Sequence, residues 1–171
     1  WLSWLLIIGG QQVRTDLTIP VIKVLSETEY AGPASTNQVS TLQPDSALFR
    51  IWSMSGVSHS DWASGVVRNA IVRRDMPNAN LYDACPQSRS RVPGHYIMAA
   101  AVDALKDWVR QGAPAPIAPR MTLTSMDPPA VARDEFGNVL GGIRMPTLAV
   151  PTAVDQGVGT GPGLCFLNGV H

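Results

Sequence analysis

Two short apolar runs in the first third of the chain predict neighbouring buried strands. Ile19–Leu25 and Ala47–Met54 are rich in β-branched and aromatic residues, and each is long enough for a buried strand. Pro20 stands near the start of the first run, where strands tolerate a proline. The connection from Ser26 to Ser46 exceeds the roughly dozen residues that a parallel crossover needs. We therefore predict parallel neighbours whose C-terminal ends share one edge of a sheet.

A helical period marks the middle of the chain. Between Pro93 and Gly112, apolar residues recur at helical spacing and form one stripe, made of Ile97, Ala101, Ala104, Leu105, Trp108 and Val109. Gly112 suits the position after a helix end, and Pro114 blocks continuation. We predict a helix over 94–111 that packs this stripe on the sheet. Residues 62–92 carry turn residues without a sustained period, which predicts an irregular excursion.

The pattern changes to β character after Pro116. Residues 121–124 alternate, and Asp134–Asn138 has the turn residues of a hairpin. The run 147–150 lies between two prolines and predicts an edge strand. Gly141 and Gly142 indicate positive φ or a close backbone approach. The fold class is therefore α/β, with a sheet-and-helix part over 1–116 and a β-rich extension over 117–171.

Composition favours one globular domain and argues against several kinds of partner. The 171 residues are 45% apolar and 15% charged, and thirteen basic residues balance thirteen acidic ones. No basic patch stands out, so we expect no nucleic-acid partner. Trp1–Ile8 is too short to span a bilayer and predicts a core strand or helix end, without a membrane partner. Both ends are apolar and predict that the sequence is a piece of a larger protein.

The two cysteines lack metal-ligand spacing. Cys85 and Cys165 either form a disulfide across a long loop or remain as free buried thiols, and the sequence leaves both alternatives open. The cellular compartment stays open for the same reason. We expect neither a metal nor a cofactor.

A histidine stands just beyond the second predicted strand. His59 lies in the small-residue turn Gly56–Asp61, where parallel α/β sheets place their chemistry. Its ordinary pKa of about 6.5 suits proton transfer. Glu27 and Glu29 follow the first strand, so an acid and a histidine share one sheet edge, as in a Ser-His-acid triad. Glu29 reaches further round the turn and is favoured as the acid, with Glu27 as the alternative.

The sequence offers no complete nucleophile motif. A nucleophile elbow reads G-x-S-x-G, and the nearest match, Gly56–Ser60, has serine in place of the last glycine. Ser58 is the rival nucleophile, but no histidine follows a later strand to serve it. We interpret His95, at the start of the predicted helix, as structural rather than catalytic.

Several motifs occur in the order seen in one known family. The motifs are Pro20–Glu29, Gln43–Asp45 with Phe49–Trp52, Gly56–Asp61, His95–Tyr96, and Arg133–Asn138 with Gly141–Pro146. On these residues the chain resembles, over about 17–169, the C-terminal part of the bacterial "alpha/beta hydrolase domain" family of esterase-like proteins.

The resemblance implies an α/β-hydrolase fold with a serine elbow upstream of Trp1 and with His59 as the catalytic histidine. Members of this family often carry aspartate where Glu29 stands, so the resemblance leaves open whether the acid is Glu29, Glu27 or neither. Arg144 falls in the most specific motif, where it either lines a pocket or pins the hairpin through a salt bridge.

We therefore expect a serine esterase or lactonase that acts on a small-molecule ester. His59 is the expected general base, and Glu29 orients it. The competing hypothesis is a non-catalytic hydrolase-like domain used for binding or assembly. A G-x-S-x-G motif upstream of Trp1 would favour the enzyme, and the 171 residues alone are expected to be inactive under both hypotheses.

Overall fold

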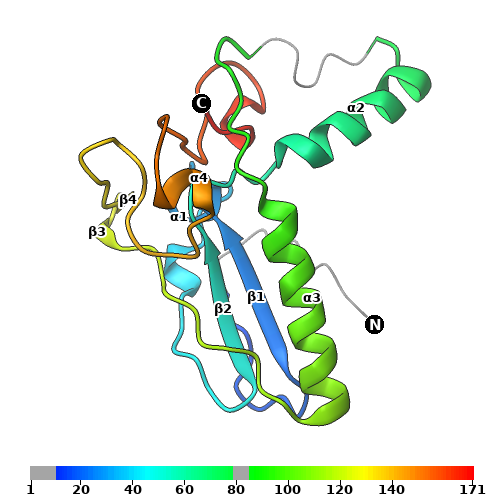
Figure 1. Ribbon diagram of the computed structural model, residues 1–171, viewed down its shortest axis with the longest axis vertical. Helices are drawn as coiled ribbons and strands as arrows, with labels where there is room; N and C mark the ends of the chain where they lie inside the picture. The colour runs from blue at the N-terminus through cyan, green and yellow to red at the C-terminus, as the bar shows by residue number, and fades with distance from the viewer. Residues whose placement is uncertain (1–10, 79–84) are drawn as a thin grey trace.

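In the part of the chain that the structure describes, the central sheet has two parallel strands. A computed structural model describes residues 11–78 and 85–171, so the interpretation of Trp1–Ile8 lies outside the described residues. Strands β1 (Val21–Ser26) and β2 (Phe49–Met54) pair in register from Val21 opposite Phe49 to Ser26 opposite Met54. Figure 1 shows them side by side with their C-terminal ends at one edge. The prediction of adjacent parallel strands is confirmed.

Helix α3 (Gly94–Gln111) covers one face of the sheet (Figure 1). Ile97, Ala101 and Trp108 are buried and join Trp52 of β2 in one core cluster. The helix ends at Gly112, which takes the predicted positive φ of 70°. Val109, predicted in the stripe, is 62% exposed. Successive residues of a helix point about 100° apart, so Val109 points away from the face on which Trp108 is buried.

A second core cluster lies on the opposite face of the sheet. Phe49 and Ile51 alternate along β2 with Arg50 and Trp52, so the two faces of this strand serve two clusters. The second cluster also contains Leu25, Tyr30, Val39, Met121 and Val139. Tyr30 belongs to the short helix α1 (Glu27–Ala31), and Val39 begins the 3₁₀ turn Val39–Thr41.

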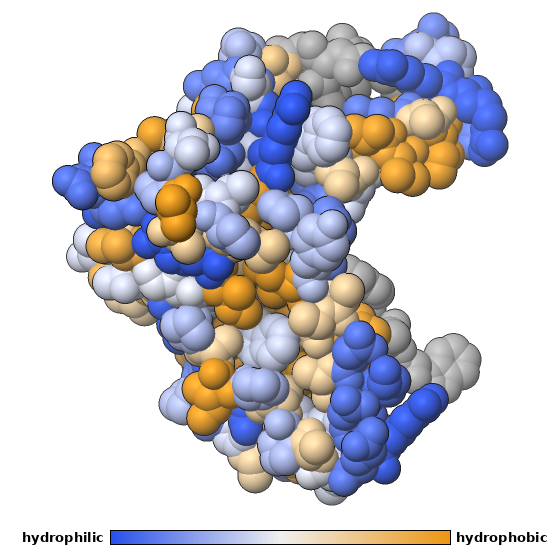
Figure 2. Space-filling view, in the orientation of Figure 1, coloured by the Kyte–Doolittle hydropathy of each residue, from blue (hydrophilic) through white to orange (hydrophobic). Residues whose placement is uncertain are grey.

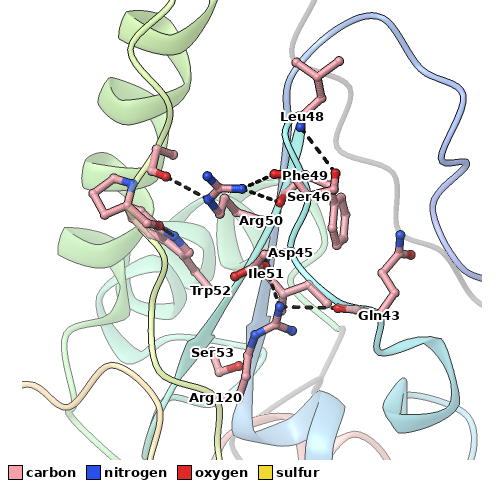
Figure 3. A network of polar contacts seen from close by, with 12 residues as sticks. Gln43, Asp45, Ser46, Leu48, Phe49, Arg50, Ile51, Trp52, Ser53 and Arg120 are labelled. Atoms are coloured by element: carbon pink, nitrogen blue, oxygen red, sulfur yellow. Dashed lines mark hydrogen bonds and ion pairs between the residues drawn. The ribbon is translucent and has the colours of Figure 1, made fainter.

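The region after α3 is anchored by polar contacts to β2 and to the segment just before it. Arg50 Nε donates to Ala115 O at 2.9 Å, and Trp52 Nε1 donates to Pro116 O at 3.0 Å (Figure 3). Arg120 Nη2 pairs with the Asp45 carboxylate at 2.5 Å. These bonds satisfy donors at the edge of the core and fix the path of the chain toward the β-rich region.

Strands β3 (Leu123–Met126) and β4 (Pro129–Val131) form a separate antiparallel pair. Beyond it, an antiparallel bridge between Arg133 and Val139 closes the turn 134–138. Gly141 and Gly142 have the expected positive φ, 74° and 68°. A Cβ on Gly142 would lie 2.1 Å from Ser55 Oγ, so this approach to the end of β2 requires glycine.

The expectation of irregular chain after residue 61 is wrong, because Trp62–Asp75 forms helix α2. Asp61 caps this helix by accepting a hydrogen bond from Ser64 N at 3.0 Å. In α2, the residue that is buried is Gly65. Apolar side chains of this helix are exposed, including Val66, Val67 and Ile71, and the surface over α2 shows apolar patches (Figure 2). A helix that buries so little needs no single apolar stripe, so the periodic signal is missing.

The expected edge strand at 147–150 is also wrong, because Pro146–Ala149 forms the short helix α4. Proline is favoured in the first turn of a helix, where its missing N–H costs nothing. Cys85 and Cys165 form a disulfide, which decides between the two alternatives; Cys165 begins the 3₁₀ turn Cys165–Leu167. In the part of the chain that the structure describes, no helix has the length and apolar character needed to cross a membrane.

Candidate active site

A capping box at the end of β1 fixes the position of Glu29. Ser26 caps helix α1, and Glu29, at the third helical position, folds back on this cap. Glu29 Oε2 accepts hydrogen bonds from Ser26 N at 2.7 Å and from Ser26 Oγ at 2.6 Å. The Glu29 side chain is only 9% exposed. One carboxylate oxygen therefore stabilises the local fold, and the other, Oε1, is left to face the next loop.

His59 lies opposite Glu29, in the loop that follows β2. Its Nδ1 is 2.5 Å from Glu29 Oε1. An ionised carboxylate only accepts hydrogen bonds, so Nδ1 carries the proton and Nε2 is the nitrogen left for proton exchange. The hydrogen bond to Glu29 raises the pKa of His59 above its ordinary value of 6.5, while partial burial acts in the opposite direction. The predicted contact between the two side chains is present.

Further hydrogen bonds join helix α1, which we call the acid helix, to the turn Gly56–Asp61, which we call the histidine loop. Glu27 N donates to Val57 O at 2.9 Å, and Gly56 N donates to Glu27 Oε2 at 3.1 Å. His59 N donates to Thr28 Oγ1 at 2.9 Å. The two segments that follow β1 and β2 are thus joined by backbone contacts as well as by the Glu29–His59 pair.

Glu27 differs from Glu29 in its partners. It is fully buried, and its Oε1 pairs with Arg133 Nη2 at 2.7 Å while Oε2 accepts from Gly56 N. Both carboxylate oxygens are therefore engaged away from the imidazole. Of the two glutamates that the sequence left open, Glu29 is the one that contacts His59.

Arg144 pins the turn region through a salt bridge. Its Nη2 lies 2.9 Å from Asp134 Oδ2 and donates to Leu148 O at 2.5 Å. Of the two interpretations left open for this arginine, these contacts agree with the structural one.

Ser58 and His95, the other residues weighed from the sequence, make local contacts. Ser58 is 3% exposed, and its Oγ donates to Ser60 O at 2.9 Å rather than to a general base. The His95 ring lies beside the Tyr96 ring, with the ring centres 4.2 Å apart and the ring planes tilted by 40°, and His95 Nδ1 lies 3.8 Å from Asp61 Oδ2. These contacts are typical of structural side chains.

A cavity of about 500 Å³ opens beside the Glu29–His59 pair. Its wall combines apolar side chains with polar ones, namely Val24, Leu25, Met54, Val57 and Met98 with Gln38, Asp61, Ser64 and His95. A largely apolar cavity with a few convergent polar groups suits a small organic molecule. Within 11–78 and 85–171, no cluster of three or more His, Cys, Asp or Glu side chains could hold a metal ion.

Two residues of this site were not anticipated from the sequence. Ser26 had a local signal, because Ser26-x-x-Glu29 is the pattern of a capping box. Thr28 had none, because its partners, His59 and Gly157, lie 31 and 129 residues away.

The model of a family described as "Alpha/beta hydrolase domain" matches residues 5–171, a range that includes both strands, the acid helix and the histidine loop. No match was found among curated proteins or among solved structures.

Proposed function

Because the chain belongs to the alpha/beta hydrolase domain family, we propose that it provides the acid and the histidine of a serine hydrolase acting on small esters or lactones. The observation that carries this proposal is the Glu29–His59 contact at the C-terminal edge of two adjacent parallel strands. A triad needs this combination, because the histidine moves a proton and the carboxylate orients the imidazole and stabilises its charged form.

In the proposed reaction, His59 Nε2 takes the proton of a serine hydroxyl as the serine oxygen attacks the ester carbonyl. The tetrahedral intermediate collapses, and His59 returns the proton to the departing alcohol, which leaves an acyl-serine. Water then attacks the acyl group with the same help from His59 and releases the acid. Glu29 holds the imidazole in place throughout, because its two bonds from Ser26 keep Oε1 aimed at Nδ1.

The serine is proposed to lie upstream of Trp1. The chain order in this fold is serine, acid, histidine, so the nucleophile precedes Glu29. The best internal candidate, Ser58, comes after Glu29 and donates its hydroxyl hydrogen to Ser60 O. Among the described residues β1 pairs with β2 alone, so its other edge can accept a further strand.

The test is His59→Ala in the full-length protein, assayed on a p-nitrophenyl ester. We expect kcat to fall by about 10⁴-fold or more, because only substrate binding and oxyanion stabilisation remain. His95→Ala is the matched control, since it removes a second imidazole from the same cavity, and it should change stability more than rate.

Near-full turnover by His59→Ala, together with an inactive His95→Ala, would show that the triad assignment is wrong. Absence of hydrolysis by the parent protein, with no G-x-S-x-G upstream of Trp1, would favour the competing function, a hydrolase-like domain used for binding or assembly.

A further inference from the structure

One buried hydroxyl joins three segments that are far apart in the sequence. Thr28, in the acid helix α1, is fully buried. Its Oγ1 donates to Gly157 O at 2.6 Å and accepts from His59 N at 2.9 Å. A threonine hydroxyl has a single hydrogen, so donation to Gly157 turns a lone pair toward the His59 amide. The order of donation along this chain of bonds is therefore fixed.

The third segment is the C-terminal strap, which we define as residues 155–171. Its two ends are bridged where Gln156 and Val170 exchange backbone hydrogen bonds of 2.8 and 2.9 Å. The strap also contacts the histidine loop directly, because Ser60 N donates to Leu167 O at 2.8 Å. The disulfide from Cys165 to Cys85 ties it to the segment before α3.

The strap approaches the site closely at Gly157. A Cβ at this position would lie 2.4 Å from Glu27 Cβ and 2.4 Å from Val57 O. Contacts this short leave no room for a side chain between the strap, the acid helix and the histidine loop. The Gly157 carbonyl is therefore held at a fixed place relative to Thr28.

We propose that Thr28 is a positioning residue for His59: its hydroxyl, oriented by the Gly157 carbonyl of the C-terminal strap, holds the His59 backbone where the ring meets Glu29. The inference rests on the proposed function, because this alignment affects rate only if Glu29 and His59 form a catalytic pair. The His59 amide is partly buried. Without this acceptor it would be left unsatisfied, so the loop would shift to find another partner.

The test compares two variants of Thr28 in the full-length protein. Thr28→Val keeps the shape of the side chain and removes the hydroxyl, whereas Thr28→Ser keeps the hydroxyl. We expect Thr28→Val to lower kcat by about 10- to 100-fold with little change in KM, because small misplacements of a catalytic group cost about this much. Thr28→Ser should recover the parental rate to within a few-fold.

A second readout separates positioning from folding. The pKa of His59, followed by NMR titration of its ring, should fall in Thr28→Val because the bond to Glu29 loosens. Arg68 of α2, whose charge lowers the pKa of His59, is the same in both variants, and so are Asp61 and His95, which line the same cavity. A change in the pKa therefore reports the contact with Glu29.

An unchanged kcat and an unchanged His59 pKa in Thr28→Val would overturn the inference. A lower melting temperature with an unchanged pKa would also overturn it, because Thr28 would then serve folding alone. If Thr28→Val does not fold, Thr28→Ala and Thr28→Ser, which differ by one oxygen, are compared instead, and equal pKa values for His59 would reject the role.

The experiments distinguish failure of the serine hydrolase proposal from failure of the role proposed for Thr28. A parent protein that hydrolyses no ester, and whose His59→Ala variant behaves identically, rejects the serine hydrolase. The NMR titration of His59 in the Thr28 variants still decides whether the hydroxyl positions the ring.

Discussion

Glu27 and Glu29 lie two residues apart in one helical turn, and their different positions in the turn give the two carboxylates different partners. Glu27 begins α1 and is buried against Arg133 and the Gly56 amide. Glu29, at the third position of the helix, folds back on Ser26 and presents its second oxygen to His59. We therefore expect replacement of each carboxylate by its amide to have different effects, on the rate for Glu29 and on stability for Glu27.

Glu29→Gln in the full-length protein should lower kcat by about 10³- to 10⁴-fold, because an amide does not hold the imidazole tautomer or stabilise its charged form. A general base acts when neutral, so the rate rises with pH through the pKa of His59. Glu29 raises that pKa above 6.5, and the variant should move the acidic limb of the pH–rate profile to lower pH. The measurement is kcat across pH 5–9.

Glu27→Gln is the control for this prediction. It should lower the free energy of unfolding by about 1–3 kcal/mol, because Arg133 loses its charged partner. The acidic limb should stay where it is in the parent. If the acidic limb of the pH–rate profile shifted in Glu27→Gln and did not shift in Glu29→Gln, Glu27 rather than Glu29 would be the acid that pairs with His59.

At the scale of the elements, α2 and α3 contrast in how much of their surface they bury. Helix α3 lies along the sheet and contributes three buried apolar side chains to the core cluster around Trp52. Helix α2 extends from the body of the molecule with apolar side chains exposed (Figures 1 and 2). Packing on the sheet therefore stabilises α3, whereas the cap from Asp61 defines the start of α2.

Trp108→Ala should lower the free energy of unfolding by about 3–5 kcal/mol, the usual cost of truncating a buried aromatic side chain. Trp108 is 5% exposed, and the Arg50 guanidinium lies 4.9 Å from the centre of its ring. Urea denaturation measures the change. Val109→Ala, next to it on the exposed side of the helix, should cost less than about 0.5 kcal/mol. Equal costs for the two variants would contradict the packing of α3.

At the scale of the whole molecule, the C-terminal strap connects the end of the chain with the histidine loop. The Cys85–Cys165 disulfide holds one side of the strap, and its other side bonds to Thr28 through Gly157. The strap thus combines a covalent constraint with hydrogen bonds to the candidate site.

Replacing both Cys85 and Cys165 by serine should lower the free energy of unfolding by about 4–5 kcal/mol in the chain-entropy model. The reason is that the cross-link spans 80 residues, so the unfolded chain gains much freedom without it. Denaturation of the parent with and without a reductant checks this value. The reductant should reproduce the effect in the parent and change nothing in the double variant. A loss below about 1 kcal/mol would contradict the prediction.

The sequence by itself determined the features that depend on neighbouring residues. The apolar runs that form β1 and β2, the stripe of α3 and its end at Gly112 all express local pattern. Because parallel strands bring their C-terminal ends together, the sequence also indicated that a glutamate and His59 would meet. The Ser26-x-x-Glu29 pattern is local too and favours Glu29 over Glu27 once it is recognised as a capping box.

Only the tertiary structure decided the features that depend on distant residues. Helix α2 buries little surface, so its sequence carries no period that would reveal it. The pairing of Cys85 with Cys165, the salt bridge from Glu27 to Arg133 and the bond from Thr28 to Gly157 join residues 80, 106 and 129 apart. Such contacts leave no local signature, because the chain's path through space, rather than its spacing in sequence, brings the partners together.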